Sequence, residues 1–367
     1  MRLIASAKRK PCKWIVCAIA LSTTSLLSLL ALPAHTRECS NLETPTQSTQ
    51  SCSTPETPAA PSERVLIPGT SVSLSPPPGF VLSDQFSGFV NPDSFSSIVL
   101  VEMPPEAYSD LAAIFSDTPT AIDEAFAERG ITIETESVET LSVQEGAIPW
   151  VTATQFADGI RVKKYFGLLG KDGESTQLLT VNVIEPDPLS EDTIVTAVSS
   201  IEISPTLSLS EKAAALPFTF ETADPFQLFE VLAGSSVLLN LTGEVDPSGQ
   251  APLIIIANSL SSVQPASLSA LATNLLQNTD GFANVDIVEQ SAVEFAGQTG
   301  DFIRATLPKE SSSESAAETS DTSTILQYLA ILPDDFYIRL IVLGNAEELE
   351  TLMPAIQTIQ SSVEAQP

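Results

Sequence analysis

Histidine and cysteine are nearly missing from this chain of 367 residues. The single histidine is His35, and the four cysteines are Cys12, Cys17, Cys39 and Cys52. The rest of the chain therefore lacks the imidazole and thiolate groups of Ser-His-Asp and Cys-His nucleophile pairs, HExxH zinc sites and Cys/His metal cages. A P-loop and a GxGxxG motif are also absent. We accordingly expect no catalytic, cofactor-binding or metal-binding residue and no cofactor.

Basic residues are scarce as well. The chain has 16 Lys and Arg against 46 Asp and Glu, and five of the bases fall within the first 34 residues, which hold no acid. The remainder carries 11 bases against 46 acids, a net charge of −35. Such a body is repelled by phosphate backbones and by anionic lipid, so nucleic-acid binding is excluded. Two explanations of the acidity stay open. It can serve solubility, or it can attract divalent cations or a basic partner.

The first 34 residues are typical of an export signal, because a basic start precedes an uncharged apolar run. That run, Trp14 to Ala34, is 21 residues long. A span of that length exceeds a usual signal core and is enough to cross a bilayer, which takes about 20 residues. Two alternatives stay open: cleavage near Ala34, or retention as an N-terminal membrane anchor or tether through residues 14–34. Both place the remainder outside the cytoplasm, in a periplasm or lumen.

Residues 35–62 are predicted to be a disordered linker rich in Ser, Thr and Pro, since they contain no apolar block that could be buried. In an oxidising compartment Cys39 and Cys52 could pair within it. The alternative is two unpaired cysteines. Neither arrangement would staple the folded part of the chain.

The folded part repeats itself. The stretch "NPDSFSSIVLVEM" at 91–103 returns as "DPSGQAPLIIIAN" at 246–258, each a turn followed by an aliphatic strand. We therefore predict two tandem domains, at 63–204 and 217–367, with an interdomain linker at 205–216. The second domain carries an acidic, Ser-rich insert at 308–323, expected to be a mobile loop.

Each domain is predicted to be α+β, a mainly antiparallel sheet covered by helices. Further strands are expected at 131–139, 148–156, 160–169 and 177–184, from alternation and turn signals. A helix is expected to start at the N-cap Ser190 and to bury Ile194, Val198 and Ile201. In the second half, helices are expected at 266–277 and 346–363, with Pro354 inside the latter as a candidate kink.

This order of elements resembles the PsbP/Mog1-like fold, the family of the extrinsic photosystem II subunit PsbP. The resemblance rests on "PPPGFVLSDQFSGFV", "SSIVLVEM", "ITIETESVETLSVQEG" and the terminal "TIVTAVSSIEI". It covers nearly all of 65–204 and, more faintly, 217–364. The family has no invariant catalytic motif, so the resemblance implies a binding or assembly protein and carries over no site residue. A tandem pair departs from the family pattern.

Three local features are candidate sites. Asp187 and Asp192 in "EPDPLSED" lack the residue order and the glycine of an EF-hand. Any pair among 46 acids could serve a glycosidase-like hydrolase, which makes no single pair informative. "RVKKYFG" at 161–167 is the one basic spot, with Arg161, Lys163 and Lys164. It indicates either a docking patch for an acidic partner or protection of a strand against aggregation.

The function predicted from these features is a non-catalytic, extracytoplasmic binding or assembly protein with an unknown protein partner. One alternative is a thylakoid-lumen photosystem-associated factor. The other is an exported carboxylate-dependent hydrolase. Converging Asp or Glu residues with a raised pKa in a pocket would favour the hydrolase, whereas a flat or apolar patch between the domains would favour a protein partner.

Overall fold

A computed structural model describes residues 63–366 except 106, 129–130, 145, 158, 171–174, 247–250, 280 and 308–322. The predictions for the leader 1–34, the linker 35–62 and a Cys39–Cys52 pair lie outside these residues, as does nearly all of the insert 308–323. Within the described part of the chain, no helix has the length and apolar character needed to cross a membrane.

The first half forms a seven-stranded sheet in which all neighbours run antiparallel. Its inner strand β5 is buried along its whole length because both faces are covered, which explains its unbroken aliphatic sequence. The spatial order is β3 (Val81–Leu82), β4 (Gly88–Val90), β5 (Ser97–Met103), β9 (Thr176–Ile184), β8 (Ile160–Leu169), β7 (Gly146–Ala157) and β6 (Glu134–Val143).

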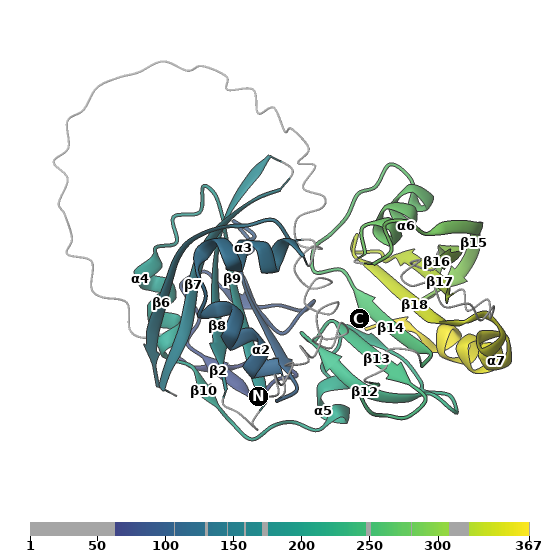
Figure 1. The fold of residues 1–367 in the computed structure, drawn as a ribbon, viewed down its shortest axis with the longest axis horizontal. Helices are drawn as coiled ribbons and strands as arrows, with labels where there is room; N and C mark the ends of the chain where they lie inside the picture. Colours follow the sequence, from purple (N-terminus) through teal and green to yellow (C-terminus); the bar gives the residue numbers. More distant parts are fainter. Residues whose placement is uncertain are drawn as a thin grey trace, which may run out of the picture.

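The second half repeats this topology strand for strand, and Figure 1 shows the two sheets side by side. In both sheets the first three strands in the sequence lie at one edge. The last strand of the sequence pairs with the third, and the remaining strands follow in reverse sequence order to the other edge. The order is β12 (Gln227–Leu232), β13 (Ser236–Asn240), β14 (Leu253–Asn258), β18 (Tyr337–Asn345), β17 (Ser323–Ile331), β16 (Gln298–Leu307) and β15 (Asp286–Phe295). The α+β class and the tandem arrangement of two sheet domains are therefore confirmed.

Even the small sheets are duplicated. In the first half β2 (Val72–Leu74) pairs with β10 (Glu202–Ile203) after the terminal helix, and β1 (Val65–Leu66) adds a third strand. In the second half β11 (Phe218–Thr219) pairs with β19 (Glu364–Ala365) in the same way. Each half thus ties its beginning to its own end.

Helices cover both faces of each sheet. One face carries α2 (Ala107–Phe115) and α3 (Pro119–Ala127) in the first half but the single helix α6 (Leu268–Gln277) in the second. The other face carries α4 (Glu191–Ser199) or α7 (Ala346–Ser362). Ser190 caps α4 as predicted, accepting a hydrogen bond from the Thr193 N–H at 3.3 Å.

The three residues predicted to be buried have no exposed surface: Ile194 and Val198 lie on α4, and Ile201 follows the end of the helix. Pro354 lies inside α7, as expected from the sequence.

The direct alignment of the two repeats is one residue out of step. It sets Val99 against Ile254, but these side chains lie on opposite faces of their sheets, since Val99 belongs to the cluster under α2 and Ile254 to the cluster under α7. The structural equivalent of Val99 on the matching face is Ile255. Successive strand residues face opposite ways, so a shift of one residue exchanges the two faces.

Three apolar clusters hold the molecule together. One lies between the first sheet and α4, and a second lies between the second sheet and α7. The third is shared, running from Phe115, Phe126 and Phe166 in the first half to Leu271 and Ile341 in the second. The two halves are therefore alike in topology but share part of their core.

Polar contacts also join the halves. The Ser87 N–H donates to the Ala233 carbonyl at 2.6 Å, and the Asn258 amide donates to the Gln85 carbonyl at 3.0 Å. Within the segment 205–216, predicted as a linker, lies the short helix α5 (Leu209–Ala213), which packs on β12 and appears at the bottom of Figure 1 between the two sheets. That connecting segment is therefore part of the interface.

Candidate functional site

The junction between the two halves contains a buried lysine, Lys212, on α5. The helix is fixed at its start by a capping box, in which the Ser208 hydroxyl and the Glu211 carboxylate satisfy each other's backbone N–H groups. The Ser208 hydroxyl also donates to the Glu211 carboxylate at 2.7 Å, and this bond, together with the one from the Ser208 N–H, holds the pKa of Glu211 below its usual value. The cap orients the single turn so that Lys212, only 7% exposed, points inward.

Glu102 receives this lysine from the first sheet. It lies near the end of β5, opposite Gln177 on β9, and is 4% exposed. Its Oε1 is 3.1 Å from the Lys212 ammonium, at an angle outside the range of a hydrogen bond, and its Oε2 is 3.4 Å from both the N–H and the hydroxyl of Ser71. A buried carboxylate needs such a counter-charge, because an isolated one is strongly penalised.

Glu230 on β12 supplies a second carboxylate from the other half. Burial raises its pKa to about 7, and the charge of Glu102 adds to this rise, whereas the ammonium of Lys212 opposes it. One of its oxygens accepts a hydrogen bond from the N–H of Val231 at 3.1 Å. Glu230 can therefore exchange a proton near neutral pH.

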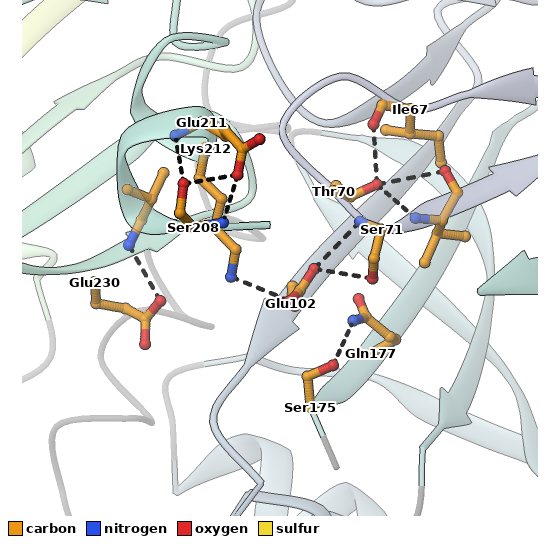
Figure 2. Close-up of polar contacts among 12 residues, drawn as sticks. Ile67, Thr70, Ser71, Glu102, Ser175, Gln177, Ser208, Glu211, Lys212 and Glu230 are labelled. Atoms are coloured by element: carbon orange, nitrogen blue, oxygen red, sulfur yellow. Dashed lines mark hydrogen bonds and ion pairs between the residues drawn. The ribbon is translucent and has the colours of Figure 1, made fainter. Parts of the chain in front are cut away.

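We call Glu102, Lys212 and Glu230 the junction triad (Figure 2). Figure 2 shows Lys212 reaching Glu102, with Glu230 on the other side of the Lys212 side chain. The Lys212 ammonium thus balances the Glu102 carboxylate of the first sheet and also interacts electrostatically with Glu230 of β12. Chemically, the arrangement can couple the protonation of Glu230 to the contact between the two halves.

Two further charged groups are buried beneath α6, at opposite ends of that helix. Asp301 accepts a hydrogen bond at 2.7 Å from the Ser269 hydroxyl in the first turn of α6. At the other end, Arg339 donates from Nε to Gln327 at 2.8 Å and from both terminal nitrogens to Thr279 at 3.1 Å. A carboxylate at the start of a helix and a cation at its end both complement the helix dipole.

Burial lowers the pKa of Arg339 to about 10, which leaves it charged at neutral pH. Lys164 on β8 is a third buried base. It donates to Asn182 at 2.6 Å, and burial lowers its pKa to about 8. Both groups are held by neutral amide or hydroxyl oxygens, so they have structural roles within the shared cluster.

The basic spot at 161–167 does not form a docking patch. Arg161 pairs with Glu185 at 3.1 Å, Lys163 pairs with Glu136 at 2.5 Å, and Lys164 is buried. The interpretation as a surface for an acidic partner is therefore wrong, because each charge at this spot is neutralised or removed from water. The ion pair with Lys163 also lowers the pKa of Glu136.

The two aspartates weighed for calcium are not brought together. Asp187 accepts from the Ser94 hydroxyl at 2.5 Å and from the Leu189 N–H at 2.9 Å. Burial raises the pKa of Asp187, but these hydrogen bonds outweigh burial and lower it overall. Asp192 lies in the first turn of α4. Across the part of the chain that the structure describes, no cluster of three or more metal-ligating side chains occurs.

Sequence reasoning missed the junction triad. Two weak signals were available: Glu102 interrupts the aliphatic run "SIVLVEM", and Lys212 is a rare base in an acidic body. Neither signal says which distant element completes the site.

Comparison with known proteins leaves the family open. No family model and no curated protein match the chain. Solved structures with some likeness include LpqN of Mycobacterium tuberculosis, at 18% identity, a TM-score of 0.31 and coverage of 41% of this chain and 83% of that one. PsbP (CyanoP) of Synechocystis matches at 11% identity, a TM-score of 0.29 and coverage of 41% and 87%. The immunity protein TplEi of Pseudomonas aeruginosa matches at 11% identity, a TM-score of 0.28 and coverage of 84% and 100%.

Proposed function

We propose that this chain is a non-catalytic, extracytoplasmic binding or assembly protein whose partner is a cationic protein. The observation that carries the proposal is that every described Lys and Arg side chain is either buried or paired with a glutamate. Lys164, Lys212 and Arg339 are buried, and the others are each paired with a glutamate. The exposed pairs are Arg64–Glu202, Arg161–Glu185, Lys163–Glu136 and Arg304–Glu289.

The described surface therefore presents carboxylates as its unbalanced charge. A surface of one sign steers an oppositely charged partner and raises its association rate, and it repels nucleic acid and anionic lipid. This favours the partner-binding explanation of the acidity over the general explanation of solubility.

The shared core and the junction triad support the same function in a second way. They hold two sheets as one body, so a partner would meet a single extended surface. Large, preorganised surfaces suit protein partners, because little ordering is needed on binding. The compartment follows from the leader: we propose a periplasm or lumen. We also propose that the chain is of the PsbP/Mog1-like type, for which a role as a thylakoid-lumen photosystem-associated factor is the alternative function.

One observation favours the alternative of a carboxylate-dependent hydrolase, namely the raised pKa of Glu230 near a second carboxylate. Against it, the ammonium of Lys212 and the Ser71 groups already occupy both oxygens of Glu102. Purified protein should therefore release no sugar or ester product, and Glu230→Gln should leave that background unchanged. Turnover lost in Glu230→Gln would establish the hydrolase instead.

The test of the binding proposal is affinity capture. The protein, immobilised through a C-terminal tag, is exposed to the extracytoplasmic fraction of its source cells, and bound proteins are eluted with a salt gradient. A second column carries an unrelated protein of matched net charge. We expect basic proteins retained by the first column alone and released as ionic strength rises. Retention of the same set by both columns, or release that salt does not affect, contradicts the proposal.

A further inference from the structure

The two sheets end in equivalent edge strands, β6 and β15, but the edge of β6 is covered by helices and the edge of β15 is more open. Both strands are ten residues long and carry a bulge at the same place, between Thr135 and Ser137 in β6 and between Ile287 and Glu289 in β15. An edge strand exposes backbone N–H and C=O groups that can pair with another strand. Proteins usually cover or blunt such edges.

The edge of β6 is covered. Both α3 and α4 pack against it, and side chains from these helices bond its outward backbone groups. Asp123 accepts from the Thr135 N–H at 2.8 Å, and the Ser199 hydroxyl donates to the Ser142 carbonyl at 3.4 Å. Outward groups near both ends of β6 are thus occupied.

The edge of β15 is more open. Its helix α6 lies over β16 and β17, and residues 288–292 are exposed, with Val288 at 64%. Gln360 of α7 donates to the Glu294 carbonyl at 3.0 Å, which shows that this carbonyl points away from β16. Because orientation alternates along a strand, the N–H and C=O of Ala292 and Gln290 point outward too. Among the described residues, neither backbone has a hydrogen-bond partner on that side.

The charges along β15 indicate which kind of strand could pair with this edge. The strand has three acids, Asp286, Glu289 and Glu294, and contains no Lys, Arg or Pro, the residues that commonly protect an edge. A second copy of β15 would bring like charges together, which is destabilising. The insert at 308–323 is itself acidic, and the Pro-rich segment 36–62 lacks N–H donors at its prolines.

We propose that β15 is a docking edge, which adds to the second sheet one extended segment of a partner protein that carries Lys or Arg at alternate positions. This inference rests on the proposed function and names the surface that would serve it. Main-chain hydrogen bonds to Ala292 and Gln290 hold the added strand. Its basic side chains are attracted by whichever of Asp286 and Glu294 lies on their face of the sheet, because Glu289 already pairs with Arg304.

The test uses a labelled ten-residue peptide of alternating Lys and Val, with binding to the full-length protein followed by fluorescence anisotropy. Ala292→Pro removes an outward N–H without breaking the ladder to β16, and proline is tolerated at such edge positions. The matched control is Thr140→Pro, the equivalent position on the covered edge β6. We expect binding at least about tenfold weaker in Ala292→Pro and unchanged in Thr140→Pro.

A second measurement leaves the protein untouched. A peptide N-methylated at every residue cannot donate main-chain hydrogen bonds on either edge, so wild-type protein should lose affinity for it. A peptide of alternating Glu and Val should not bind. Equal affinity for the methylated and unmethylated Lys peptides would overturn the docking edge even if Ala292→Pro failed to fold. Capture of the same basic proteins by folded Ala292→Pro and by wild type would also overturn it, while leaving the proposed function intact.

Discussion

The Lys212 ammonium and the Glu102 carboxylate, 3.1 Å apart, form a buried ion pair between α5 and the inner strand β5 of the first sheet. Their side chains are 9% and 4% exposed, so each depends on the other for charge balance. Removing one partner of a buried pair strands the other charge in a poorly solvated place.

Lys212→Met should therefore destabilise the protein by about 3–5 kcal/mol, measured by urea denaturation. The double variant Lys212→Met with Glu102→Gln should recover much of that loss, because it leaves no unpaired charge. Arg304→Met is the matched control, since the Arg304–Glu289 pair is about half exposed with its atoms 4.0 Å apart. Its cost should stay below about 1 kcal/mol. Equal losses in the two single variants would show that the junction pair contributes no more than a surface pair.

Stability should fall as pH rises between about 4.5 and 7. Glu230 has a pKa of about 7 in the folded protein, against 4.5 for the free side chain. In that interval the folded state holds a proton that the unfolded state has released, so the free energy of unfolding decreases with pH. The contribution of Glu230 is complete below pH 4.5 and is lost by pH 7, at most about 3 kcal/mol.

The check is a series of thermal melts across this range for wild type and Glu230→Gln. The variant should be the more stable of the two above pH 7, because a neutral amide replaces a buried carboxylate beside Glu102. Its melting temperature should also vary less between pH 4.5 and 7. Parallel curves for the two proteins would mean that Glu230 titrates normally.

The parts of the fold that were predictable are those set by local chemistry. The apolar run "SIVLVEM" predicts a strand. The Ser190 cap and the spacing of Ile194, Val198 and Ile201 predict α4. The repeat was visible because turn and strand recur together. Its register was not, because both strands are apolar on both faces and lack alternation, so alignments one residue apart look almost equally good.

The candidate site was not predictable for a different reason. Glu102, Lys212 and Glu230 come from β5, α5 and β12, and they meet only because the two halves share a core. In the sequence, Glu102 and Glu230 are two among 46 acids. The same limit applies to the edge of β15, whose exposure depends on where α6 lies.

The hydrogen bonds around Arg339 give a third prediction. Gln327→Leu removes the acceptor of the Arg339 Nε–H while keeping the size of the side chain. The substitution also removes the Gln327 amide that donates to the Ala272 carbonyl at 2.9 Å. Together the two unpaired groups should cost at least about 1–3 kcal/mol, measured as a fall in the urea midpoint with an unchanged slope. Gln357→Leu, at an exposed position of α7, is the control and should lie within about 0.5 kcal/mol of wild type. A similar small effect for Gln327→Leu would mean that Thr279 alone satisfies the guanidinium.

The contact between the halves at Ser87 can be tested with a glycine. Gly234 has a φ of +59°, and a Cβ placed there would lie 2.3 Å from the Ser87 hydroxyl and 2.9 Å from its backbone nitrogen. Gly234→Ala must therefore push apart the Ser87–Ala233 hydrogen bond in addition to straining its own backbone. Gly281→Ala isolates the strain, because Gly281 has a φ of +80° and nothing within 4 Å of its would-be Cβ.

The control should lose about 1–2 kcal/mol, the cost of a side chain in the left-handed region. Gly234→Ala should lose clearly more and should also speed amide exchange at Ser87, whose N–H bonds across the junction. The difference between the two variants measures what close approach contributes to holding the halves together. If both variants lose the same stability and Ser87 exchanges at the wild-type rate, the two halves are joined by the apolar cluster and the junction triad, and the Ser87–Ala233 contact adds nothing.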